Sequence, residues 1–256
     1  MLLALDIGNT NVTIGVFEGP ELRATWRLSS DTGKMSDEYA SVLISLLRLE
    51  GIEPAGIHHA VVASVVPALT PMFEELCRRY FGVLPMRVGA GVRTGLRVMY
   101  DDPREVGADR IVDAVAGLRL HKPPLIIIDC GTTTVLNAVS REGDYLGGAI
   151  APGIGMAADA LAQRAALLRR VDLQLPKRAI GSNTAAALQS GILLGFAGLI
   201  ESMVGRFKDE LGDDAWVIGT GGWSGLMSEL TPVFDHVDPN LTLTGLRLVY
   251  EMNEGA

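Results

Sequence analysis

Apolar residues occur in short blocks separated by glycine turns along the first eighty positions. Three blocks, at residues 2–5, 12–17 and 22–28, predict consecutive antiparallel strands, and the first is apolar enough to be buried on both faces. Helical spacing of apolar residues follows at 36–49, and Gly51 is placed to end that helix. A strand at 60–66 and a helix at 68–80 complete the order βββαβα.

The chain then repeats this arrangement. Residues 88–107 fit no regular period and predict a surface loop, and a helix follows from Ala108 to about His121. Pro123 and Pro124 break that helix and mark our predicted domain boundary, which gives an N-terminal half 1–122 and a C-terminal half 123–256. Beyond the prolines, apolar blocks at 125–128, 134–139 and 145–150 again predict three strands.

The two halves also share a turn motif. Asp6-Ile7-Gly8-Asn9-Thr10-Asn11-Val12 aligns with Asp129-Cys130-Gly131-Thr132-Thr133-Thr134-Val135: a buried strand, an acidic residue, a glycine turn, polar residues and a second strand. Such a hairpin can hold phosphate oxygens on its amides and a cation on its carboxylate. One hairpin alone is more simply a plain turn, but the pair indicates two similar α/β halves that face each other across a cleft.

Two later segments add to this picture. Residues 216–218 predict a strand that feeds Gly219-Thr220-Gly221-Gly222, a turn where a flat base or ribose could lie against the backbone, although packing alone also produces such turns. A helix is expected at 223–230. Residues 185–204 form a long apolar helix, which we interpret as a buried helix at a subunit contact rather than a membrane span. The sequence contains no GxxxxGK[ST] motif, which excludes a P-loop.

Composition narrows the function classes. The 256 residues carry a formal net charge of −8, which argues against binding nucleic acid through its phosphates. A group of arginines (Arg87, Arg93, Arg97, Arg104 and Arg110) could still bind an anion. Two cysteines cannot build a disulfide framework, the four histidines lack partners at ligand spacing, and the N-terminus does not resemble a signal peptide. We therefore expect a cytoplasmic protein without a membrane or nucleic-acid partner.

Several motifs, in order along nearly the whole chain, carry a family resemblance. They are residues 6–11, Tyr100-Asp101-Asp102-Pro103, Gly107-Ala108-Asp109-Arg110, Asp129-Cys130-Gly131-Thr132, residues 147–153 and Gly181-Ser182-Asn183-Thr184. The hairpins and the glycine turn resemble the phosphate and adenosine motifs of the acetate and sugar kinase, Hsp70 and actin superfamily. Within it, the set is similar to type III pantothenate kinase. The implied fold is α/β, with duplicated ribonuclease H-like (actin-like ATPase) βββαβα halves and an interdomain cleft.

The resemblance also implies a reaction, its cofactors and its site residues. The reaction would be ATP-dependent phosphorylation of pantothenate to 4′-phosphopantothenate, the first step of coenzyme A biosynthesis, in a homodimer that needs Mg²⁺ and either K⁺ or NH₄⁺. The ATP contacts would be Asp6, Ile7, Gly8, Asn9, Thr10, Asn11, Val12, Thr13 and Thr132, with Asp6 also near magnesium. Asp129 matches the monovalent-cation ligand. The pantothenate contacts would be Tyr100, Gly107, Ala108, Asp109, Arg110 and Thr184, with Asp109 also the catalytic proton acceptor.

Each of these side chains also has a simpler interpretation. Asp109 and Thr184 could only cap helices, Arg110 could form a surface ion pair with Glu105 or Asp113, and Tyr100 could lie at a subunit boundary. Thr133 and Ala151 depart from the family pattern, which more often has alanine at the first position and a bulkier apolar residue at the second. Two other functions remain open: phosphorylation of another small metabolite, and a non-catalytic regulatory role on the same fold.

Overall fold

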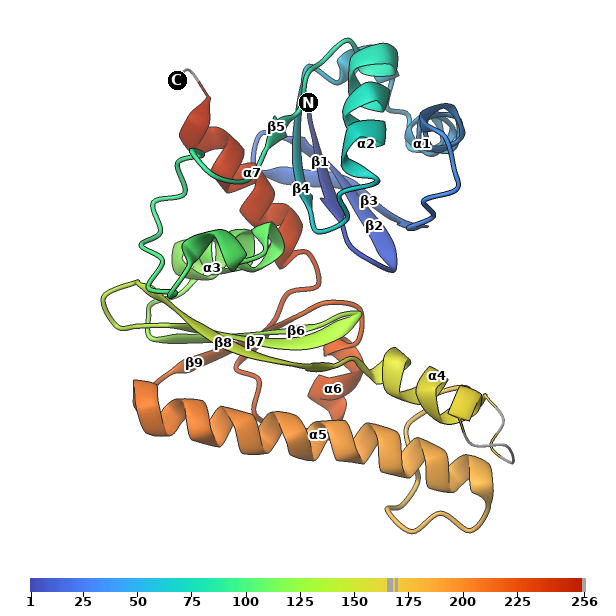
Figure 1. Ribbon diagram of the computed structural model, residues 1–256, viewed down its shortest axis with the longest axis vertical. Coiled ribbons are helices and arrows are strands. Elements are labelled where there is room, and N and C mark those ends of the chain that lie inside the picture. The colour runs from blue at the N-terminus through green and yellow to red at the C-terminus, as the bar shows by residue number, and fades with distance from the viewer. Residues whose placement is uncertain (165–167, 169, 255–256) are drawn as a thin grey trace. The chain divides into compact units, whose positions relative to one another are not determined.

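The computed structural model describes residues 1–164, 168 and 170–254, and it contains two five-stranded sheets of one topology (Figure 1). The strand order is β3-β2-β1-β4-β5 in the first sheet and β8-β7-β6-β9-β10 in the second. In each, the first three strands are antiparallel neighbours, and the fourth pairs in parallel with the first. The duplication predicted from the hairpin motifs is therefore confirmed at the level of sheet topology.

The elements of the first sheet follow the predicted blocks closely. Its strands are β1 (Leu2–Ile7), β2 (Asn11–Glu18), β3 (Glu21–Ser29), β4 (His59–Ser64) and the short β5 (Met86–Arg87). The helices are α1 (Ser36–Leu49), α2 (Thr70–Leu76), which continues as a π-helical turn (Cys77–Phe81), and α3 (Ala108–Leu120), with 3₁₀ turns at Pro54–Gly56 and Pro103–Glu105. Gly51 adopts a φ of 69°, the left-handed conformation that ends α1 as expected.

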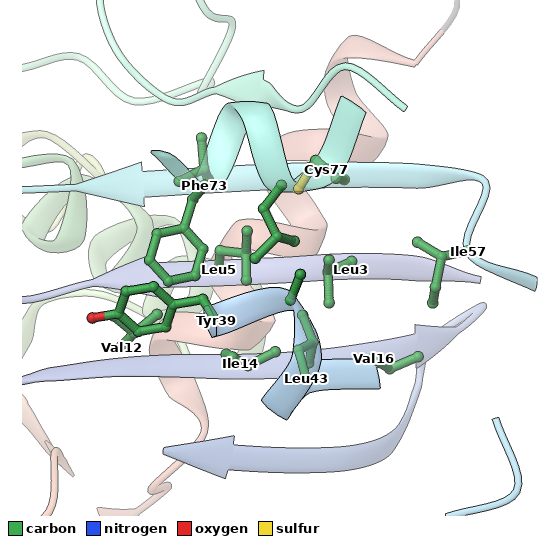
Figure 2. Close-up of a cluster of buried hydrophobic side chains, with 14 of the residues drawn as sticks. Leu3, Leu5, Val12, Ile14, Val16, Tyr39, Leu43, Ile57, Phe73 and Cys77 are labelled. Atoms are coloured by element: carbon green, nitrogen blue, oxygen red, sulfur yellow. The ribbon is translucent and has the colours of Figure 1, made fainter. Parts of the chain in front are cut away.

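Two helices cover one face of this sheet. Alternate residues of β1, including Leu3 and Leu5, are fully buried against side chains of α1 and α2. Figure 2 shows Tyr39 of α1 and Phe73 of α2 above this face, with ring centroids 4.8 Å apart. The Tyr39 hydroxyl lies 2.8 Å from the amide of Asp31, whose hydrogen it accepts, so the ring packs in the core while its polar end is satisfied.

The opposite face of the first sheet packs against α7 (Leu241–Asn253). A Cβ on Gly15 would lie 3.0 Å from a methyl carbon of Leu243, and the guanidinium of Arg247 lies over the ring of Phe17. A Cβ on Gly245 would lie 2.1 Å from the carbonyl oxygen of Val112, so α7 also contacts α3 backbone to backbone. These contacts explain why β1 is buried on both faces, as its apolar sequence predicted.

The second sheet has its own core. Its strands are β6 (Leu125–Cys130), β7 (Thr133–Val139), β8 (Tyr145–Pro152), β9 (Trp216–Thr220) and β10 (His236–Val237). Helices α4 (Ile154–Arg164), α5 (Thr184–Leu211) and α6 (Ser224–Leu230) supply buried residues to one apolar cluster with β6 and β7. On the other face, Gly117 of α3 allows close approach, because a Cβ there would lie 2.8 Å from Ile127 Cδ1.

Helix α5 is partly buried within this chain, and its place at a subunit contact remains a prediction. Its inward residues include Ile192, Leu193 and Ile200, which join the core. Its 28 residues and mean hydropathy of 1.5 would suit a membrane span by length and composition, which is weak evidence for one, and a third of that apolar window is buried inside the protein. Leu188, Phe196, Leu199 and Met203 are partly buried against the same core, and the remaining face of the helix is exposed.

The compact units of the chain are not continuous in sequence. One contains residues 1–95, 102–116 and 242–256, and the other contains 96–101 and 117–241. The C-terminal helix α7 therefore belongs with the first unit, although it follows the second sheet. The predicted domain boundary, with halves at 1–122 and 123–256, remains a prediction.

Candidate functional site

The first Asp-Gly hairpin joins β1 to β2. The amide of Gly8 donates to the carbonyl of Asn11 at 3.0 Å, which closes the turn, and the hydroxyl of Ser30 donates to the carbonyl of Gly8 at 2.6 Å. Asn9, Thr10 and Asn11 are exposed, whereas Asp6 is half-buried at the end of β1. The bond from Ser30 fixes the backbone of this turn, and the turn exposes polar side chains. Ser30 was not among the site residues predicted from the sequence.

The second hairpin joins β6 to β7 in the same way. The amide of Gly131 donates to the carbonyl of Thr133 at 3.0 Å, and Thr132 at its tip is half-buried. A Cβ on Gly131 would lie 3.1 Å from Asp129 Oδ1, so the carboxylate folds over the glycine. Thr133, where the sequence departs from the family pattern, is the first residue of β7 and leaves this hairpin intact.

Asp109 lies in the first turn of α3, beside a glycine that makes room for its carboxylate. A Cβ on Gly107 would lie 2.3 Å from Asp109 Oδ1 and 3.6 Å from a methyl of Val65. Val65 in turn donates its amide to the carbonyl of Ile7 in the first hairpin, at 3.0 Å. The backbone of the first hairpin and the carboxylate of Asp109 therefore both border the same short segment after β4.

The capping interpretation of Asp109 accounts for only one of its oxygens. Oδ1 accepts the amide of Arg110 at 2.8 Å, a contact that stabilises the start of the helix. In the part of the chain that the structure describes, Oδ2 has no hydrogen bond to protein. A helix-capping role and a role as proton acceptor are thus compatible.

Arg110 is buried, with 7% of its surface exposed, which excludes the surface ion pair considered from sequence. Asp113, one turn further along α3, is 2% exposed and accepts the hydroxyl of Thr242 from α7 at 2.7 Å. Burying a guanidinium and a carboxylate is costly unless both are bonded. The start of α3 is therefore a fixed polar segment inside the first unit.

Tyr100 belongs to the second unit, where its ring covers a glycine of β8. A Cβ on Gly147 would lie 3.1 Å from Tyr100 Cε2, and Gly147 has a φ of 121° that other residues rarely adopt. The tyrosine is half-buried. Gly147, the first residue of the 147–153 motif, is therefore required for the packing of Tyr100.

Thr184 is the first residue of α5 and is exposed. The residue that caps this helix is Asn183, whose side chain accepts the amide of Ala186 at 2.9 Å. The interpretation of Thr184 as only a helix cap is therefore wrong. Its hydroxyl lies at a helix start, where backbone amides favour an anionic ligand.

Two members of the arginine group are bound to carboxylates. Arg97 bonds Asp144 through two nitrogens, one at 2.8 Å, and Arg104 bonds Asp102 at 2.8 Å. These contacts raise the pKa of each arginine and lower the pKa of each aspartate. The prediction that the five arginines together bind an anion is therefore wrong for Arg97 and Arg104, because carboxylates of the protein already bind their guanidinium groups.

Packing explains two glycines of the Gly-Thr-Gly-Gly turn. A Cβ on Gly219 would lie 2.8 Å from the ring of Phe234, and a Cβ on Gly221 would lie 2.2 Å from Asp129 Oδ1. Gly221 also has a φ of 85°. The turn is thus built to approach the second hairpin closely, and its glycines are not evidence for a bound base.

The two cysteines, Cys77 and Cys130, are free and buried, and their surroundings make both thiols unreactive. Burial, with the nearby Glu74, raises the pKa of Cys77 to about 12, and burial with Asp129 does the same for Cys130. Since the thiolate is the reactive form, we expect folded protein at pH 8 to react with a disulfide reagent at least about a hundred-fold more slowly than unfolded protein. The release of thionitrobenzoate with and without guanidinium measures this ratio, and equal rates would contradict it.

The predicted site residues divide between the two units. The first unit brings together the hairpin from Asp6 to Thr13 and residues Gly107–Arg110. The second unit contains Tyr100, Asp129, Thr132 and Thr184. Across the described ranges, no group of three or more His, Cys, Asp or Glu side chains could hold a metal ion.

Comparison with solved structures defines the class of fold. The chain is similar to an inorganic polyphosphate/ATP-glucomannokinase from Arthrobacter sp. strain KM, with a TM-score of 0.52, 13% identity and 98% of each chain covered. It is also similar to a Baf family protein of Campylobacter jejuni, proposed there as a transcriptional activator, with a TM-score of 0.60, 18% identity and 99% and 100% coverage. The protein thus has the duplicated ribonuclease H-like α/β fold that these structures share.

Sequence comparison then gives the family. The model of the type III pantothenate kinase family matches residues 2–206. Type III pantothenate kinases of Dehalococcoides mccartyi (strain ATCC BAA-2266 / KCTC 15142 / 195) and Moorella thermoacetica (strain ATCC 39073 / JCM 9320) are 48% and 49% identical over 253 residues, which is 99% of this chain and 98% and 100% of theirs. The chain belongs to the type III pantothenate kinase family.

Proposed function

We propose that this protein transfers the γ-phosphoryl group of ATP to the primary hydroxyl of pantothenate and releases ADP and 4′-phosphopantothenate. Family membership over nearly the whole chain supports the reaction. The observation that carries the site is the placement of Asp109 over Gly107, beside the segment whose Val65 amide bonds the first hairpin. A carboxylate and a phosphate-binding turn in one unit are what a kinase needs at the acceptor hydroxyl.

In the proposed step, the hydroxyl oxygen of pantothenate forms a bond to the γ-phosphorus while the bond from that phosphorus to the β,γ-bridging oxygen breaks. The bonding electrons leave with ADP. The hydroxyl proton passes to Asp109 Oδ2, while Oδ1 keeps its bond to the amide of Arg110. Because the transition state of phosphoryl transfer is loose, the base mainly orients the hydroxyl and accepts its proton late.

The remaining contacts follow the family motif. The first hairpin, Asp6 to Thr13, binds ATP phosphates through its amides and polar side chains, and Thr132 adds a contact from the second hairpin. Arg110, with Gly107 and Ala108, binds the carboxylate or hydroxyl groups of pantothenate, because a guanidinium pairs well with a carboxylate. Tyr100 and Thr184 complete the pantothenate contacts.

Two cations belong to the proposal. Asp6 suits Mg²⁺ because it offers a half-buried carboxylate at the base of the first hairpin. Asp129 suits K⁺ or NH₄⁺, since it offers a half-buried carboxylate at the base of the second hairpin, in a position that the missing side chains of Gly131 and Gly221 make possible. When bound, these cations would neutralise phosphate charge, and the residues of the two hairpins would hold the phosphates in place.

We also propose a homodimer formed through the exposed face of α5. Small residues recur there at intervals of three or four positions: Ala187, Gly191, Gly195, Gly198, Ser202 and Gly205 are all exposed. A Cβ on any of these four glycines would meet no atom within 4 Å. A stripe of small residues allows a second helix to approach closely, and a second copy of this apolar helix is the partner that fits.

A Gly198→Arg variant should dissociate this dimer. The open space around Gly198 lets the protomer accommodate the arginine, whereas a helix packed on the stripe could not. Light scattering at micromolar concentration should report a dimer for the wild type and a monomer for the variant. Gly225→Arg, at an equally open glycine on α6, is the matched control and should remain dimeric. A monomeric wild type would refute the dimer.

Assays of the same purified protein also test the two alternative functions that the sequence left open. A kinase of another small metabolite would phosphorylate sugars faster than pantothenate, and a non-catalytic regulator would show no turnover. The presence of Asp6, Asp109 and Asp129 favours a working kinase, and the net charge disfavours DNA binding. We expect ATP, Mg²⁺, K⁺ and pantothenate to give phosphopantothenate in a coupled ADP assay, and we place this reaction in the cytoplasm. Absence of pantothenate turnover would overturn the proposal.

A further inference from the structure

The hydroxyl of Thr220 is buried without a hydrogen bond. Thr220 is the last residue of β9 and is 1% exposed. Its Oγ1 has no hydrogen-bond partner among the described residues. A buried hydroxyl without a partner costs free energy, and a bound water or ion is one explanation for such a group.

The position of Thr220 is set by the pairing of β6 with β9. In this parallel pair, Thr220 lies directly opposite Asp129. Register partners on neighbouring strands project to the same face of a sheet, with their backbones about 4.8 Å apart. The threonine hydroxyl and the aspartate carboxylate are therefore neighbours on one face, at the end of both strands.

The residue after Thr220 extends this arrangement. A Cβ on Gly221 would lie 2.2 Å from Asp129 Oδ1 and 2.7 Å from the carbonyl carbon of Cys130. Any side chain at position 221 would occupy the space beside the carboxylate. The Gly-Thr-Gly-Gly turn thus contributes an oxygen at Thr220 and, at Gly221, a backbone that lies directly against the carboxylate of Asp129.

The first unit provides an internal comparison. There the strand pair β1 and β4 is equivalent to β6 and β9, and Asp6 lies opposite Ala63. Alanine has no oxygen, and the residue after it is Ser64 rather than glycine. The two carboxylates of the duplicated hairpins therefore differ in the strand from which a hydroxyl faces them: Thr13 on the antiparallel neighbour β2 for Asp6, and Thr220 on the parallel neighbour β9 for Asp129.

We infer that Thr220 supplies a second protein oxygen, beside Asp129, to the monovalent cation. The inference rests on the proposed function, since the family resemblance is what assigns this cation to Asp129. One carboxylate and one neutral hydroxyl give a single negative charge, which suits K⁺ better than a divalent ion that prefers more charge and strict octahedral geometry. Neutral oxygens replace the hydration shell of K⁺ in other proteins.

Binding of K⁺ alone tests this inference without any turnover. The midpoint of thermal unfolding should rise with KCl at constant ionic strength set by tetramethylammonium chloride, because an ion that binds only the folded state stabilises it. Thr220→Val, which keeps the shape and removes the oxygen, should raise the half-saturating K⁺ concentration at least ten-fold. Thr220→Ser, which keeps the hydroxyl, should stay within about three-fold of the wild type.

Thr231→Val is the matched control. Thr231 is also buried, at 3% exposure, with a hydroxyl that has no partner among the described residues, but it follows α6 rather than facing Asp129. Its K⁺ response should equal that of the wild type. An unchanged K⁺ response in Thr220→Val, or no response in the wild type, would overturn the inference.

Crystals of the wild type soaked in thallium acetate give a second measurement that needs no variant. An anomalous peak within bonding distance of both Asp129 and Thr220 Oγ1 is expected, and a peak at Asp129 alone would overturn the role of Thr220. The kinase assay separates the two proposals: turnover of pantothenate without a Thr220-dependent K⁺ response removes only this inference, whereas that response without turnover removes only the proposed function.

Discussion

An Asp109→Asn protein is expected to lose about 10²–10⁴-fold in kcat for pantothenate, the range that general acid–base residues contribute. Asparagine keeps the shape of the side chain, and its Oδ1 can still accept the amide of Arg110, so the start of α3 should be preserved. The amide group cannot take up the hydroxyl proton. The affinity for ATP should remain within about three-fold of the wild type, because the phosphate hairpin is untouched.

Steady-state rates with varied pantothenate, and calorimetric titration with an ATP analogue, separate these two effects. Asp37→Asn is the matched control, since Asp37 is also in the first turn of a helix but is exposed and bonded to Arg79 at 2.7 Å. That variant should keep wild-type turnover. If Asp109→Asn turned over pantothenate at the wild-type rate, its carboxylate would have only a capping role.

The strands and the duplication could be predicted because their signals are local. Each buried strand is a short apolar block, and each hairpin repeats one acidic residue and one glycine at the same spacing. The helix at 36–49 has the bounds that its apolar spacing predicted. The antiparallel pairing of the first three strands of each sheet also followed from the pattern, since strands joined by short turns pair with their neighbours.

Features that depend on distant partners could not be predicted. The bond from Arg97 to Asp144 joins residues 47 positions apart, and it removed one member of the arginine group from the predicted anion site. The position of Thr220 opposite Asp129 depends on the register of β6 with β9, which no local pattern encodes. Likewise α7 packs on the first sheet although it follows the second.

A fourth such feature is the contact between Gly153 and the second hairpin, which leads to a prediction with a large effect. Gly153 follows β8, and a Cβ there would lie 2.0 Å from the carbonyl oxygen of Thr132 and 2.8 Å from that of Gly131. These are backbone atoms of the hairpin that we propose binds ATP. The Pro-Gly end of the 147–153 motif is therefore a support for that hairpin.

Gly153→Ala should displace the Gly131-Thr132 backbone, because neither carbonyl can move without moving the turn. We expect the KM for ATP to rise at least about ten-fold, and the free energy of unfolding to fall by about 1–3 kcal/mol, the usual cost of overpacking a buried position. Kinetics with varied ATP and urea unfolding monitored by circular dichroism measure the two effects.

Gly155→Ala is the matched control: it adds the same methyl group near the start of α4 but makes no contact with the hairpin. No atom lies within 4 Å of a Cβ at Gly155, and alanine is favoured over glycine inside a helix by about 1 kcal/mol. That variant should keep the wild-type KM for ATP with equal or higher stability. Should Gly153→Ala also keep both values, the hairpin would have to tolerate a side chain at 2.0 Å from its backbone, and its rigidity could not be the basis of phosphate binding.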